Sequence, residues 1–208
     1  TVAAISHANQ LLAESPRLEA EEQRLTEIIG EHALRMERMV ETILQLSRRD
    51  TSRAEEIDLV QWLEDFTKEF RERRQLAEIA LDIQNEAGDN LRVRVDPAHL
   101  HQILWNLSEN SLRHAQSQAN GIEFKLVATG KPGRVELDIL DRGPGVPAEI
   151  VEHIFEPFYT SSPRGSGLGL FIARELCECN HARLSYEPRA GGGSCFRILF
   201  NTPEGWFS

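Results

Sequence analysis

The sequence predicts an α+β protein in which an amino-terminal helical hairpin precedes a two-layer α/β sandwich. Residues 1–48 carry apolar side chains at helical spacing. From residue 57 to 208, segments that alternate like strands are interleaved with amphipathic helical segments. The stretch between them, 49–56, is polar and charged, which is typical of a linker. Strands and helices mixed in this way pack as a sheet with helices on one face.

The composition excludes several classes of protein. With 208 residues and 40% hydrophobic content, the chain is long enough for a globular core. Its net charge of −10 argues against binding nucleic acid through the phosphate backbone. The sequence lacks a secretory signal and an apolar run of the ~20 residues that cross a bilayer, so we expect no membrane contact in this part.

The cysteine content favours a reducing compartment. Cys177 and Cys179 suggest a metal site, but Cys195 is isolated and no partner stands at zinc-type spacing. An odd number of cysteines does not indicate a disulfide framework. We therefore expect reduced, structural thiols.

The first 48 residues predict two helices that dimerise. Ser15-Pro16 interrupts the first helix, and good helix formers dominate from Glu19. Spacings of four and three then produce a heptad seam of Leu25, Ile29, His32, Met36, Met39, Ile43 and Leu46. Such a short hairpin cannot bury its apolar faces alone, which predicts a homodimeric four-helix bundle. The apolar pattern is already running at Val2, so we expect the first helix to be truncated.

The sandwich elements follow from caps and alternation. Asp58 is positioned to cap a helix, and Pro97 fits the first turn of another. The remaining pattern predicts strands at 79–83, 91–95, 122–128, 135–140, 183–186 and 194–200, and a further helix at 169–179.

Asn106 and Asn110 are the first candidate site residues. They stand four apart on a predicted helix and therefore share one face. Amide oxygens can ligate Mg²⁺, which takes few protein ligands and adds phosphate oxygens. The neighbouring Glu109 is placed either near the metal or in solvent. The plainer interpretation is two exposed amides.

Asp141 ends a strand just before Gly143 and Gly145. A carboxylate in that position can accept a hydrogen bond from an amino group such as that of adenine. The glycines allow positive φ and close approach of a ligand. An ordinary turn rich in Asp and Gly has the same composition.

Gly165, Gly167 and Gly169 lead into the helix predicted at 169–179. Free N–H groups at a helix start form an anion site. A dinucleotide fold is disfavoured because the surrounding βαβ unit and its acidic residue are missing. Arg164 is placed either against a terminal phosphate or in solvent. Phe158 and its aromatic neighbours can anchor segment 160–164 as well as belong to the core.

These motifs together resemble the sensor histidine kinases of two-component systems. Four segments match that family's conserved boxes in order: Asn106 to Asn110, Asp141-x-Gly143-x-Gly145, Phe155 to Tyr159, and Gly165 to Leu170. The resemblance implies the ATP-binding fold shared with gyrase, Hsp90 and MutL. It also implies a dimerisation and phosphotransfer hairpin at 1–48.

The resemblance implies individual roles. Asn110 would ligate Mg²⁺, with Asn106 beside it. Arg113 and His114 would lie by the phosphates and the base, and Asp141 would bind the adenine amino group. The pocket and its lid would be shaped by Gly143, Gly145, Phe158, Arg164, Gly165, Gly167, Leu168 and Gly169.

The chain departs from the family at the phosphate acceptor. The family's histidine opens a His-Glu-x-x-x-Pro box, and aligning the residues after Thr1 places that histidine upstream of the chain. His7 is followed by Ala8-Asn9 rather than an acidic residue that could act as a general base. We therefore expect His7 and His32 to be bundle residues, and this chain to bind ATP without phosphorylating itself.

Three functions compete. A histidine kinase passes the γ-phosphoryl group of ATP to a histidine and then to a response-regulator aspartate. An ATPase clamp of the same fold needs a glutamate where this chain has Asn106, which favours transfer over hydrolysis. A non-catalytic dimerisation and regulator-docking module would not need the glycine boxes.

Within the family, the chain is similar to the sensor kinases of type IV pilus gene regulation. The similarity lies in 3–8, 44–49, 174–178 and 192–197. It implies control of pilus gene transcription. It also implies that this part is the cytoplasmic portion of an inner-membrane sensor.

Overall fold

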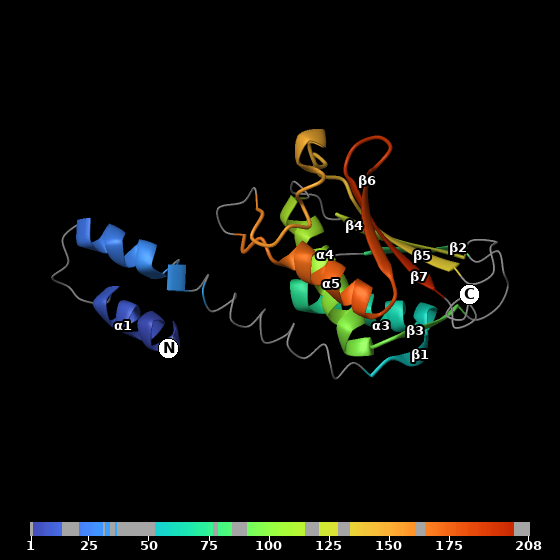
Figure 1. Cartoon of the computed structure of the whole chain (residues 1–208), viewed down its shortest axis with the longest axis horizontal. Coiled ribbons are helices and arrows are strands. Elements are labelled where there is room, and N and C mark those ends of the chain that lie inside the picture. The colour runs from blue at the N-terminus through green and yellow to red at the C-terminus, as the bar shows by residue number, and fades with distance from the viewer. Residues whose placement is uncertain are drawn as a thin grey trace.

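The computed structural model contains a mixed sheet with helices on one of its faces (Figure 1). It describes residues 2–13, 21–30, 32–33, 36, 53–76, 79–84, 91–114, 121–128, 134–160 and 165–201. The helices are α1 (Val2–Ala13), α3 (Leu59–Arg74), α4 (Pro97–His114), α5 (Gly169–Cys179) and the 3-10 helix η2 (Ala148–Ile150). The strands are β1 (Glu55–Asp58), β2 (Ala80–Gln84), β3 (Arg92–Val95), β4 (Ile122–Ala128), β5 (Arg134–Asp141), β6 (Arg183–Pro188) and β7 (Ser194–Asn201).

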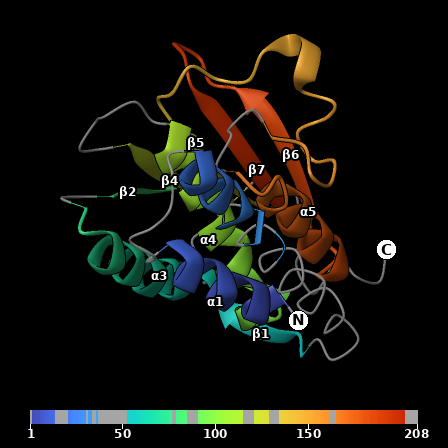
Figure 2. The ribbon, with the colours of Figure 1, turned by 90° about the vertical axis from the view of Figure 1, so that its left-hand side faces the viewer.

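The main sheet has the strand order β2-β4-β5-β7-β6. Strands β2 and β4 are parallel, and the other neighbours are antiparallel. Strand β5 is therefore central, and its last residue, Asp141, pairs with Ile122 of β4. Helices α3, α4 and α5 cover one face (Figure 2). This arrangement confirms the predicted two-layer sandwich, and the predicted strands and helices lie within a residue or two of their expected bounds.

Strand β1 begins at Glu55, inside the segment whose charge predicts a linker. It pairs with β3 in a separate two-stranded antiparallel sheet, with Glu55 opposite Val95. The two glutamates at its start are exposed. The segment therefore lacks the alternation of apolar and polar residues from which a strand is predicted.

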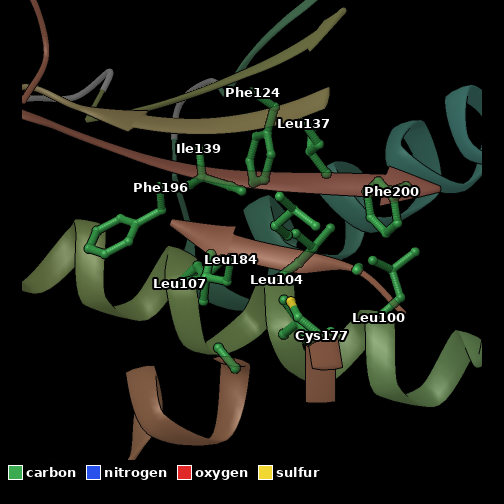
Figure 3. Close-up of a cluster of buried hydrophobic side chains, with 14 of the residues drawn as sticks. Leu100, Leu104, Leu107, Phe124, Leu137, Ile139, Cys177, Leu184, Phe196 and Phe200 are labelled. Carbon is green, nitrogen blue, oxygen red and sulfur yellow. The ribbon is translucent and has the colours of Figure 1, made fainter. Parts of the chain in front are cut away.

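The core lies between the sheet and the helices. Figure 3 shows side chains of the sheet meeting those of α4 and α5. Its labelled members, all buried, are Leu100, Leu104, Leu107, Phe124, Leu137, Ile139, Cys177, Leu184, Phe196 and Phe200. On β5 and β7 these residues stand at even spacing, as Leu137 and Ile139 do, because alternate side chains of a strand face the same layer.

Helix α3 is held by caps and by an aromatic stack. Asp58 Oδ1 accepts from the N–H groups of Val60 at 3.1 Å and Gln61 at 3.3 Å, as an N-cap should. The helix ends at Gln75, which adopts φ 53°. Its apolar face stacks Trp62 on Phe66 and Phe66 on Phe70. The last of these rings meets Trp105 of α4 edge-on at 4.9 Å.

In the amino-terminal part, α1 and the helical segment 21–30 lie against each other. A Cβ on Gly30 would stand 2.8 Å from the side-chain nitrogen of Asn9. Thr26 is buried, but Leu11 and Leu25 are 59% and 55% exposed. The seam residues Met39, Ile43 and Leu46 lie outside the described residues. Among the helices that are described, none combines the length and apolar composition needed to cross a bilayer.

The cysteines carry free thiols. Cys177 lies on the buried face of α5, and burial raises its pKa. Cys195 lies on the opposite face of the sheet, where burial and the neighbouring carboxylate of Asp138 raise its pKa to about 12. Within the described ranges, neither thiol joins a group of three metal-ligating side chains.

The raised pKa values of Cys177 and Cys195 predict that these thiols react slowly with a disulfide reagent in the folded chain. In a Cys179→Ser variant at pH 8, Cys177 and Cys195 remain protonated and buried, so we expect a disulfide reagent to label them only as the chain unfolds. Absorbance after mixing, with and without denaturant, measures the rate. Rapid labelling of either thiol in native buffer would contradict the described burial.

Candidate functional site

A cavity of about 590 Å³ opens between α4, α5 and the loops at the end of β5. This volume lies within the ~300–1,000 Å³ typical of ligand pockets. One wall consists of polar side chains of α4, and the other is formed by glycine-rich backbone and apolar side chains. The lining residues are Arg74, Trp105, Asn106, Glu109, Asn110, Arg113, His114, Pro144, Gly145, Val146, Pro147, Ile150, Ile154, Tyr159, Thr160, Ser166, Gly167, Gly169, Leu170, Ser194 and Phe196.

The α4 wall presents the predicted asparagine pair. Asn106 and Asn110 both line the cavity, as their spacing on one helix requires. The Nδ2 atom of Asn106 is buried and has no hydrogen-bond partner among the described residues. Glu109 also lines the cavity and forms an ion pair with Arg74 of α3. The Arg74 guanidinium lies 5.5 Å from the ring centre of Trp105, within cation–π range.

Asp141 lies behind the cavity lining, next to the lining residue Ser194, and is 1% exposed. Its Oδ1 accepts from the N–H groups of Gly143 at 2.8 Å and Ser194 at 3.2 Å. Its Oδ2 is buried and lacks a hydrogen-bond partner within the part of the chain that the structure describes. Because an unpartnered buried acceptor is costly, this oxygen is suited to a donor that arrives with a ligand.

The first glycine loop is packed too tightly for larger residues. A Cβ on Gly143 would stand 2.7 Å from the carbonyl oxygen of His114, at the end of α4. Gly145 has φ 75° and passes the backbone of Gly193. The hydroxyl of Tyr186 on β6 accepts from the N–H of Val146 at 2.9 Å and fixes the loop to the sheet.

The second glycine loop closes the opposite side. Gly167 has φ 69°, and a Cβ there would stand 2.4 Å from the carbonyl carbon of Phe158. Phe158 itself has φ 68°, and its side chain is 50% exposed. Helix α5 begins at Gly169, so its free N–H groups lie at the cavity. A helix start with free N–H groups can bind an anion, and this one lies next to the asparagine wall.

The structure brings most of the predicted site residues together. The cavity is lined by Asn106, Asn110, Arg113, His114, Gly145, Gly167 and Gly169. Asp141 and Gly143 support it from behind, Gly165 is buried, and Leu168 belongs to the core. Phe158 contributes its backbone contact with Gly167 while its ring is half exposed. Arg164 lies outside the described residues.

Several lining residues were not predicted. Arg74 comes from α3, which carries none of the sequence motifs. Tyr186 supports the first glycine loop from β6, again without a motif. Trp105 stands directly before Asn106, and its size was the available signal that it packs between α3 and α4. Ser194 follows a run of three glycines, which signals a close backbone approach.

The family model of histidine kinase-, DNA gyrase B- and HSP90-like ATPases matches residues 95–204. The matched part spans α4 and α5, the main sheet from β4 onward, and both glycine loops. The chain belongs to this family. The predicted ATP-binding fold type is confirmed.

The relatives are sensor proteins. The chain is 44% identical over 203 residues to the sensor protein kinase PilS of Pseudomonas aeruginosa, covering 97% of this chain and 38% of PilS. It is 32% identical over 207 residues to the sensor protein ChvG of Rhizobium meliloti, covering 91% of this chain and 36% of ChvG. These relatives confirm the sensor histidine kinase assignment. The chain spans little more than a third of their length.

Solved structures agree with this assignment. The nucleotide-free catalytic domain of the histidine kinase ThkA superposes with a TM-score of 0.62 at 28% identity, covering 74% of this chain and 99% of that domain. ThkA in complex with the response regulator protein TrrA has a TM-score of 0.67 at 24% identity, covering 98% of this chain and 58% of ThkA. The second match shows the shared fold.

The contact between Gly167 and Phe158 predicts a sharp difference between neighbouring glycines. Gly167→Ala would force a side chain into positive φ and into the backbone of Phe158, so we expect a loss of about 1–3 kcal/mol in the free energy of unfolding. Gly169→Ala is the matched control, because its Cβ would lie 4.0 Å from that of Asn106. Urea denaturation compares the two. Equal free energies of unfolding for the two variants would show that Gly167 does not keep its positive φ and its contact with the backbone of Phe158.

Proposed function

We propose that this chain binds Mg-ATP and transfers the γ-phosphoryl group to a histidine, from which an aspartate of a response-regulator receiver domain takes it. The observation that carries this proposal is the unpartnered Oδ2 of Asp141, a residue 1% exposed directly behind the cavity lining at Ser194. An adenine amino group supplies the missing donor there. The apolar lining from Val146, Ile154 and Phe196 suits the base.

The phosphates then extend along the α4 wall. Asn106 and Asn110 present amide oxygens, and Arg113 adds a positive charge at the same wall. Mg²⁺, when bound there, would supply positive charge against the negative charge that develops on the phosphates during transfer. Asn110 would hold it, since an amide oxygen ligates Mg²⁺ without cancelling its charge. The start of α5 at Gly169 contributes N–H groups on the opposite side.

Transfer is favoured over hydrolysis by the chemistry of the α4 wall. Asn106 cannot accept a proton from water. Glu109 is the one carboxylate among the described residues that line the cavity, and it supports the ATPase alternative. That carboxylate forms an ion pair with Arg74, which makes it a poorer base for activating water. A kinase therefore remains the better account.

The acceptor is a histidine other than His7 and His32. Both side chains are exposed on the helical hairpin. Residues Ala8 and Asn9 after His7 supply no carboxylate that could act as a general base. In this proposal the hairpin serves mainly as the dimerisation element.

A second copy of this chain is the proposed occupant of the exposed hairpin face. Leu11 and Leu25 are more than half exposed, and Ile5, Ile28 and Ile29 are 44–45% exposed. The heptad spacing of the second helix favours another helix pair as the cover. A dimeric four-helix bundle buries these side chains and places two nucleotide domains beside one bundle.

The identity of 44% with PilS supports a more specific role in control of type IV pilus gene transcription. The partner of ThkA in its solved complex, the response regulator protein TrrA, is of the class that this proposal requires. Use of ATP and of a response regulator supports a cytoplasmic location for this part, as the cytoplasmic portion of an inner-membrane sensor.

Asp141→Asn tests the adenine contact. Gly143 and Ser194 can still donate to the remaining oxygen, but an NH₂ group would face the adenine amino group. We expect the affinity for a non-hydrolysable ATP analogue to fall roughly 5- to 150-fold, the effect of one unsatisfied buried donor. Calorimetric titration with and without Mg²⁺ measures it.

The control for this titration is Asp65→Asn, at an exposed carboxylate of α3. A triphosphate whose purine lacks the amino group should bind Asp141→Asn and the unaltered chain alike. No binding of any nucleotide to the unaltered chain would instead support the docking-module alternative.

Incubation with ATP labelled at the γ-phosphate tests the acceptor. We expect no stable label on this chain and only background release of phosphate, because His7 lacks an acidic neighbour and Asn106 cannot activate water. Acid-labile label at His7 would overturn the first expectation. Sustained phosphate release that Glu109→Gln abolishes would establish the ATPase alternative.

Ile29→Glu tests the hairpin interface. A carboxylate buried against a second copy is unfavourable, so we expect the dissociation constant of the dimer to rise at least about tenfold, or 1.4 kcal/mol. Glu27→Gln, at an exposed position on the same helix, is the control. Sedimentation velocity over a concentration series reports both. A monomeric unaltered chain would contradict the proposed bundle.

A further inference from the structure

Asp96 occupies the junction between β3 and α4 and is 8% exposed. Its Oδ1 accepts from the N–H groups of Ala98 at 2.9 Å and His99 at 3.3 Å. This oxygen therefore caps α4, with Pro97 in the first turn. A helix cap needs only one carboxylate oxygen, which leaves the second one available.

The second oxygen holds the incoming chain. Oδ2 of Asp96 accepts from the backbone N–H of Arg53 at 2.8 Å, across 43 residues of sequence. Arg53 lies in the segment that joins the helical hairpin to the sandwich, just before β1 pairs with β3. Burial opposes ionisation of Asp96, but the N–H groups of Arg53, His99 and Ala98 outweigh it and lower the pKa of this carboxyl.

The backbone of Asp96 makes a third connection. Its N–H donates to Oδ1 of Asn180 at 2.8 Å, and Asn180 is the buried C-cap residue of α5. The Nδ2 of Asn180 donates to the carbonyl of Leu176 at 2.6 Å and lies 3.1 Å from Nδ1 of His99. The beginning of α4 and the end of α5 are therefore held together at the same point.

The other parts of these two helices line the cavity. Helix α4 carries Asn106 and Asn110, and α5 starts at Gly169. At 1.5 Å per residue, Asn106 lies about 15 Å along α4 from Asp96. Both helices are packed against each other in the core, so a shift at their joined ends moves the cavity walls as rigid elements.

We propose that Asp96 is a positioning residue that couples the placement of the interdomain linker to the nucleotide cavity, because its carboxylate holds the linker and α4 while its backbone N–H holds the end of α5. The nucleotide part of this inference rests on the proposed function. Coupling between two sites is reciprocal. A nucleotide that orders α4 and α5 therefore also stabilises the contact between Asp96 and the linker, and release of the linker lowers the affinity for nucleotide.

Asp96→Asn separates the two interactions of this side chain, the cap of α4 and the hydrogen bond from Arg53. Asparagine is as good an N-cap as aspartate, so α4 keeps its cap. The amide NH₂ that replaces Oδ2 cannot accept from Arg53. The matched control is Asp58→Asn at the N-cap of α3, where Oδ1 accepts both capping N–H groups.

A second pair of variants acts from the linker. Arg53→Pro removes the donating N–H, whereas Arg53→Ala keeps it. Hydrogen exchange measured by mass spectrometry then follows two peptides, one containing Arg53 and one covering 168–172 at the start of α5. Titration with a non-hydrolysable ATP analogue and Mg²⁺ provides the functional readout.

We expect Asp96→Asn to speed exchange at Arg53 at least about tenfold and to speed exchange in 168–172. Arg53→Pro should also speed exchange in 168–172. Both variants should lower the affinity for the ATP analogue about fivefold, which is the lower end of typical coupling between sites. Asp58→Asn and Arg53→Ala should match the unaltered chain. In that chain, the analogue should slow exchange at Arg53.

Exchange in 168–172 that is the same in Asp96→Asn, Arg53→Pro and their controls would overturn the inference, whether or not nucleotide binds. Normal analogue affinity in both variants would overturn it as well. A chain that binds no nucleotide would refute the proposed function instead, and exchange in 168–172 would still decide the coupling.

Discussion

The cavity depends on the different bonding of the two carboxylate oxygens of Asp141. One oxygen is used by the backbone of Gly143 and Ser194, and the other is left without a partner inside the fold. This works because β7 approaches β5 so closely that a Cβ on Gly193 would stand 2.1 Å from the carbonyl oxygen of Asp141. Arg189 supports the same strand end, donating to that carbonyl at 3.4 Å while paired with Glu123 of β4.

Much of the fold could be predicted from local pattern. Strands such as β4 and β5 alternate apolar and polar residues, and α3 has both a capping aspartate and an apolar stripe, so their bounds follow from period and chemistry. Strand β1 could not, because Glu55 and Glu56 are exposed and the pairing with β3 is a tertiary event. Alternation carries no information about a strand that buries only part of one face.

The site shows the same division between local and tertiary information. Asn106, Asn110 and the glycines were predictable because helical spacing and positive φ restrict which residue types serve there. Arg74 and Tyr186 were not, since each reaches the cavity or its loop from an element without any motif. Their places are decided by the packing of α3 on α4 and of β6 on β7.

The contact of Gly167 with the backbone of Phe158 also bears on how the lid can vary in length. The ends of the intervening stretch, 159–166, meet at that contact, so closure of the loop is fixed by atoms outside it. For a flexible loop, doubling the number of residues costs only about 0.6 kcal/mol in closure entropy. The position of Gly167 and the start of α5 therefore depend on this contact rather than on the number of residues between Thr160 and Gly165.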